Sequence, residues 1–170
     1  MTTAVSTRDW RDEVTEFWIA PDGEKLQQEQ QDGATALMDL STEFTDGQES
    51  KDHELIARVI GRMSDIQVRD FALGSYDEES FDAYFSMWKH LIEIAPDGFI
   101  APIATVLAAM AYESGNEVLA YQSLERAFGD TPDYPLAGLL RRVFTAGWPA
   151  QAFKSMRAEL HPKVTSHIFG

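Results

Sequence analysis

Apolar residues recur at helical spacing along most of the chain. Between residues 53 and 162 they return every three or four positions, as in the run Phe81, Tyr84, Trp88 and Leu91. No segment shows the strict alternation of apolar and polar residues that is typical of a half-buried strand. The pattern therefore predicts an all-α fold, a multi-helix array of about eight or nine amphipathic helices.

Proline and Asp-Gly pairs divide this pattern into parts. The polar run at 27–31 and the glycine at 33 are poor helix interiors, and Pro162 is expected to end the last helix. We expect residues 1–170 to form a single helical domain. Its four parts are an N-terminal helix at 1–23, with Ser6 or Thr7 as N-cap, a weakly ordered segment and linker at 24–52, a helical core at 53–162 and a tail at 163–170.

The segment 101–134 differs from the rest because small residues recur in it. Ala104 and Ala111 lie before Gly115, while Ala120 and Ala127 follow it, with Pro132 at the end. Small side chains at helical spacing let two backbones approach closely, so the segment predicts a helix, a turn and a second helix. The pair resembles a tetratricopeptide repeat, whose length of about 34 residues it matches.

Composition and charge narrow the class of protein. The chain has 170 residues, 44% of them hydrophobic, which is ordinary for a globular domain. Its 28 acidic and 14 basic side chains give a net charge of -14. Such a surface repels nucleic-acid backbones and anionic lipids, so we expect no direct contact with either.

The charge is unevenly distributed. Residues 135–170 hold five basic side chains and one acidic one, whereas the rest of the chain is strongly acidic. This polarity predicts attraction between the last helices and the remainder, either within one chain or head to tail between copies.

The sequence contains few motifs that are associated with catalysis or with ligand binding. It contains no cysteine, no Gly-rich phosphate loop and no nucleophile elbow, and its four histidines show no metal-ligand spacing. The carboxylates from Asp77 to Asp82 are read as a charged helix start. Arg69 and Asp70 are read first as an ion pair and second as a ligand clamp. We therefore expect no catalytic residue, no metal and no cofactor, and neither a signal peptide nor a membrane span.

A wider resemblance is carried by packing and turn residues. These residues include Val68-Arg69-Asp70, Trp88, Gly115, Leu124, Tyr134 and Gly147, over roughly residues 33–149. In this order they are similar to the C-terminal half of an uncharacterised actinobacterial family, domain of unknown function 4192. The resemblance implies a bacterial cytoplasmic protein and no particular reaction.

Three functions follow as hypotheses. The first is a non-catalytic helical module that binds a protein or peptide, or a second copy of itself. The alternative is an acidic inhibitor that imitates nucleic acid and occupies a DNA-binding protein, and the third is an enzyme with an unrecognised site. The likeness to tetratricopeptide repeats implies a peptide groove at Thr105, Ala109, Tyr112 and Glu113, and an acidic peptide is a candidate ligand of the otherwise ordinary basic pair Arg141 and Arg142.

Overall fold

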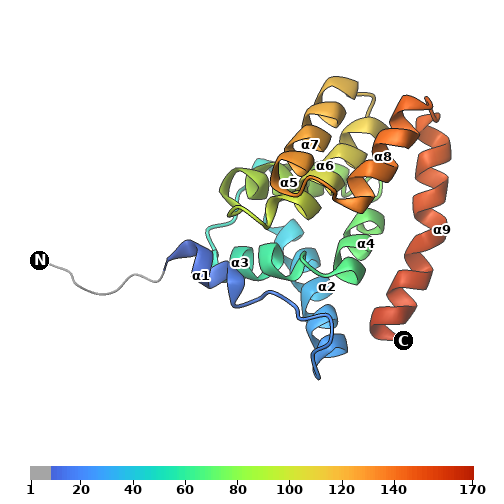
Figure 1. The fold of residues 1–170 in the computed structure, drawn as a ribbon. Coiled ribbons are helices and arrows are strands. Elements are labelled where there is room, and N and C mark those ends of the chain that lie inside the picture. The colour runs from blue at the N-terminus through green and yellow to red at the C-terminus, as the bar shows by residue number, and fades with distance from the viewer. Residues whose placement is uncertain (1–8) are drawn as a thin grey trace, which may run out of the picture.

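The computed structural model describes residues 9–170, and over that range the protein is entirely helical (Figure 1). The described residues form nine α-helices, one short 3₁₀ turn and no strand, which confirms the predicted fold class. The helices are α1 (Trp10–Thr15), α2 (Leu26–Thr42), α3 (His53–Arg62), α4 (Ile66–Ser75), α5 (Phe81–Ile94), α6 (Ile100–Glu113), α7 (Glu117–Asp130), α8 (Pro135–Thr145) and α9 (Ala150–Phe169), with the 3₁₀ turn η1 (Thr45–Gly47) before α3.

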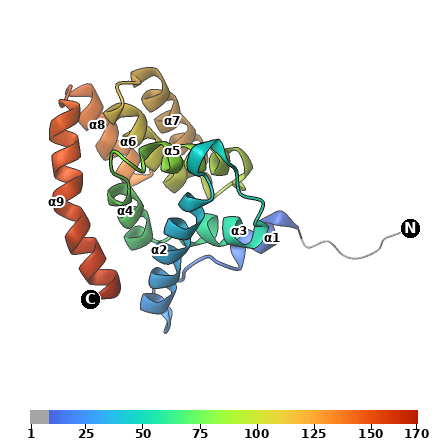
Figure 2. The same cartoon turned by 180° about the vertical axis from the view of Figure 1, so that it is seen from behind.

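Helix α6 lies at the centre of the C-terminal half. Every residue from Ile100 to Tyr112 is buried, because α4, α5, α7, α8 and α9 all pack on it. A helix that is apolar on all sides is stable in water only when it is surrounded in this way. Figures 1 and 2 show α6 between α7 and α8.

Helices α6 and α7 form a tightly packed hairpin at the predicted place. Gly115 makes the turn with φ 84°, a conformation that favours glycine. Asp130, at the end of α7, accepts hydrogen bonds from the backbone amides of Gly98, Ile100 and Ala101 at 2.6–3.1 Å, and so caps α6 from 29 to 32 residues away in sequence. The tetratricopeptide likeness of this hairpin stays a prediction.

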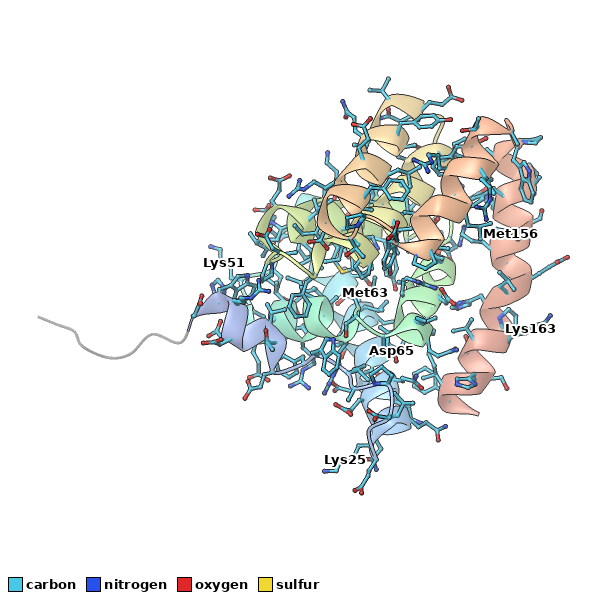
Figure 3. All side chains as sticks on the ribbon, in the orientation of Figure 1. Lys25, Lys51, Met63, Asp65, Met156 and Lys163 are labelled. Atoms are coloured by element: carbon cyan, nitrogen blue, oxygen red, sulfur yellow. The ribbon has the colours of Figure 1, made fainter. Side chains whose placement is uncertain are left out.

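Local capping signals fix several helix starts. Asp52 accepts from the amide of Leu55, and Asp65 accepts from two amides at the start of α4 (Figure 3). The N-caps expected at Ser6 and Thr7 lie outside the described residues, and α1 begins at Trp10 with Asp9 as its cap and extends only to Thr15.

Helix α2 corrects the expectation of a weakly ordered segment at 24–52. It is 17 residues long and buries Leu37 and Leu40 completely. Gly33 explains the difference, because a Cβ there would lie 2.8 Å from the Cβ of Arg62 and 2.9 Å from Val68. The glycine that weakens the local helical preference is the residue that lets α2 approach α3 and α4.

Helix α9 corrects the expectation of a tail at 163–170. It continues through Pro162 to Phe169, although proline lacks the amide needed for one helical hydrogen bond. The last turn is held from a distance: Ile168 is fully buried, and the side-chain amides of Gln27 and Gln31 donate to its carbonyl oxygen at 3.2 and 2.9 Å. Contacts with α2 and α4 thus order a segment whose own sequence favours an end.

Candidate interaction site

An apolar hollow of about 390 Å³ lies between α4, α8 and α9, and we refer to it as the α8–α9 groove. Its side walls include Leu136, Leu139 and Leu140 from α8, Met156 and Leu160 from α9, and Trp148 from the turn between them. Spacings of three and four residues place each set on one helix face. Figure 3 marks Met156 on α9.

The groove exists because α9 approaches α4 more closely than it approaches α8. Gly74 permits this approach, since a Cβ there would lie 2.3 Å from the Nδ1 atom of His161. Helix α4 is the main packing partner of α9, and the groove separates part of α9 from α8. The divergence leaves apolar side chains of both helices without a covering element.

Three large apolar side chains in the groove are exposed to solvent. The exposed fractions are 44% for Leu139, 39% for Trp148 and 51% for Leu160. Single exposed apolar residues are normal on any protein, but several that line one hollow mark a place where another apolar surface is accommodated. The groove is thus the strongest candidate for a contact surface among the described residues.

The groove lies at the basic end of the molecule. Arg142 and Lys163 are exposed, one helical turn along from Leu139 and Leu160 respectively. Arg69 lines the inner end, where its guanidinium contacts Asp70 at 2.8 Å and the hydroxyl of Tyr134 at 3.3 Å. Arg69 and Asp70 therefore form an ion pair within α4, and the contact of Arg69 with Tyr134 joins α4 to the residue before α8.

A second polar arrangement holds the inner face of α9. The guanidinium of Arg157 contacts both carboxylate oxygens of Glu113, at 2.8 and 3.1 Å, and donates to the carbonyl of Leu73 at 2.8 Å. Its central carbon lies 3.8 Å from the centroid of the Tyr76 ring, and the Tyr76 hydroxyl donates to Glu113. Burial raises the pKa of Tyr76 well above its usual value, so this hydroxyl stays protonated.

The prediction of a peptide groove on α6, the first helix of the hairpin, is wrong. Thr105 and Ala109 are fully buried, and the Thr105 hydroxyl donates to the carbonyl of Ala101. Tyr112 is 6% exposed and stacks on Phe144, with ring centroids 4.1 Å apart. Because helices surround α6, none of these three side chains is available to line a surface groove.

The remaining predicted contact residues differ in exposure. Glu113 is engaged with Arg157, and its side chain is only 8% exposed. Arg141 and Arg142 are exposed, and the guanidinium of Arg141 lies 4.6 Å from the centroid of the Phe128 ring. Arg141 is therefore directed toward Phe128 of α7, while Arg142 lies one helical turn from Leu139 of the α8–α9 groove.

One histidine has an environment that its sequence position does not suggest. The Nδ1 atom of His161 is buried and has no hydrogen-bond partner within the described residues, and the ring lies 5.1 Å from that of Phe71. Burial and the nearby charge of Arg157 lower the pKa of His161. Within residues 9–170, no group of three or more histidine, aspartate or glutamate side chains could hold a metal ion.

The fold and the groove define an all-helical protein whose last two helices leave an apolar surface uncovered. The chain belongs to the family described as Domain of unknown function (DUF4192), which matches residues 2–151 and so confirms the resemblance. No curated protein and no solved structure matches it. None of the helices within residues 9–170 is long and apolar enough to cross a membrane.

Proposed function

We propose that the protein is a non-catalytic interaction module and that the α8–α9 groove is its contact surface. The observation that supports this proposal is the convergence of Leu139, Trp148 and Leu160, all at least 39% exposed, on one hollow. Burying such side chains against a partner contributes favourably to the free energy of binding, by about 25 cal/mol for each Å² of apolar area removed from water.

The charge of the rim indicates the partner. The exposed Arg142 and Lys163 lie one helical turn from Leu139 and Leu160 of the groove, and residues 135–170 carry a net charge of +4, from five basic and one acidic side chains. This arrangement fits an acidic segment that presents large apolar side chains, such as an amphipathic helix. A rim of exposed charges makes such binding weaker at high salt.

The test uses a photo-reactive amino acid placed at single positions and irradiated in extract of the native cell. Positions 139 and 160 should give cross-linked partners, whereas position 118 should not, because Val118 is 69% exposed but lies outside the groove. The purified partner should bind Leu139→Ser at least tenfold more weakly than the wild-type chain, with Val118→Ser unchanged. Equal cross-linking from all three positions, or a chain that stays monomeric and captures nothing, would remove the proposal's support.

The nucleic-acid-mimic alternative stays a prediction. Several carboxylates have roles within the fold: Asp32 pairs with Arg58 and Arg62, and Asp130 caps α6. Asp32 and Asp130 are therefore engaged in contacts within the fold, and they do not belong to a continuous row of free carboxylates.

A further inference from the structure

Helix α9 begins where the family match ends. The match covers residues 2–151, whereas α9 spans Ala150–Phe169 and packs on α4, α6 and α2 along one side of the molecule (Figures 1 and 2). The residues that match the family thus build a body, and α9 is a further helix laid on its flank.

The contact of α9 with the body has the composition of a protein–protein interface. Of its twenty residues only Phe153, Arg157 and Ile168 are buried. The centre is a desolvated arginine, an apolar side chain is buried toward each end, and an exposed pair, Lys154 with Glu78 at 3.0 Å, lies at the rim. Interfaces typically combine such anchors with a polar rim, whereas the core of a domain is continuously apolar.

The receptor for Arg157 is built entirely by the body. Glu113 belongs to α6, Leu73 to α4, and Tyr76 to the connection that follows α4. Together they provide a carboxylate for bidentate pairing, a carbonyl acceptor and an aromatic face, which are the three kinds of group that suit a guanidinium.

The link between α9 and the rest of the chain is slight. Four residues, 146–149, join α8 to α9, and the α8–α9 groove separates parts of the two helices. Residues 150–170 carry three basic side chains and one acidic one, while residues 1–149 hold 27 acidic and 11 basic ones, so α9 is attracted to the body of any copy. Exchange of an identical element between copies keeps all these contacts and is a low-cost route to a dimer.

We propose that the flank formed by α2, α4 and α6 is an exchangeable helix-docking surface, and that its occupant in a dimer is α9 of a second copy. Docking within one chain is favoured at low concentration, because the short linker gives α9 a high effective concentration. The exchanged dimer therefore forms at high protein concentration.

The Lys154–Glu78 pair gives a direct test on the unmodified chain. Light and heavy isotope-labelled chains are mixed, concentrated, separated by size and treated with a carbodiimide, which joins an amine to a carboxylate in direct contact. In the dimer fraction about half of the 78–154 cross-links should join a light peptide to a heavy one, as random pairing of exchanged chains requires. A chain that is monomeric at every concentration, or a dimer with same-isotope cross-links alone, would overturn the proposal.

A peptide of residues 150–170 tests the docking surface separately. Arg157→Ala in the full chain weakens its own α9, so this variant should bind the peptide at least tenfold more tightly than the wild-type chain does. A peptide with Arg157→Ala should lose at least tenfold in affinity, and one with Lys154→Ala less than threefold. If Arg157→Ala does not fold, Ile168→Ala replaces it as the full chain, because this change removes a fully buried side chain of α9 and leaves the docking surface unchanged. Folded variants of both kinds that bind no peptide would contradict exchange.

Discussion

Replacing Glu113 by alanine should destabilise the protein by about 3–5 kcal/mol, because the change leaves a buried charge without its partner. The side chains of Arg157 and Glu113 are 7% and 8% exposed, so both charged groups are largely removed from water. The guanidinium would keep the carbonyl of Leu73 at 2.8 Å and the face of Tyr76, neither of which carries a compensating charge.

Helix α9, which carries Arg157, also offers a matched control. Lys154 pairs with Glu78 at a similar distance, 3.0 Å, but the two side chains are 39% and 86% exposed. Solvent screens such a pair, and Lys154→Ala should cost no more than about 1 kcal/mol. The difference between the two variants therefore reports burial and not the mere presence of an ion pair.

Urea unfolding followed by far-UV circular dichroism measures both changes. The midpoint should fall for Glu113→Ala with little change in slope, and the melting temperature should drop by about 2–4 °C for each kcal/mol in a chain of this size. The double variant Glu113→Leu with Arg157→Met removes both charges and should recover most of the loss. A Glu113→Ala cost below about 1 kcal/mol, equal to that of Lys154→Ala, would refute the reasoning that this pair is desolvated.

Four further substitutions test other parts of the structure. Gly61→Ala should destabilise the protein by about 1–3 kcal/mol, since its Cβ would lie 2.4 Å from a carbonyl oxygen of α1. Gly138 has open space around it, so Gly138→Ala should stabilise the protein by up to about 1 kcal/mol. Thermal melts compare the two variants. Asp130→Ala removes the cap of α6 and should cost about 1–2 kcal/mol in urea unfolding, with faster amide exchange at the start of that helix. His161 has a lowered pKa in the folded state, so the unfolded chain takes up the proton first and stability falls as the pH drops below about 6.5. Unfolding of His161→Gln across this pH range should lack that part of the slope, and an unchanged slope would contradict the burial of the ring.

Most of the fold could be predicted because the signals for it are local. The period of apolar residues gives the helices, and Asp52 and Asp65 cap the helices that follow them immediately. Helix α2 and the last turns of α9 could not be predicted in this way. Their order depends on close approach at Gly33 and on amides of α2 that reach Ile168, and neither partner lies nearby in sequence.

The candidate site could be predicted only in part. Arg142 and the leucine stripe of α8 are visible in the sequence, and the structure shows them exposed or lining the groove. Thr105 and Ala109 were predicted on a surface and are buried, because several helices enclose α6. Nothing in the pattern distinguishes Arg157, which is buried, from the exposed Arg141.

The sequence by itself determined the helical class, most helix positions, the family and the separation of an acidic body from a basic end, since each of these depends on residue type and spacing along the chain. The tertiary structure decided which face of each helix is buried, which carboxylate pairs with Arg157 and where an apolar surface stays uncovered. Those outcomes depend on contacts between elements far apart in sequence, such as Asp130 with α6 and Glu113 with α9. Packing geometry, and not local preference, sets the free energy of such contacts.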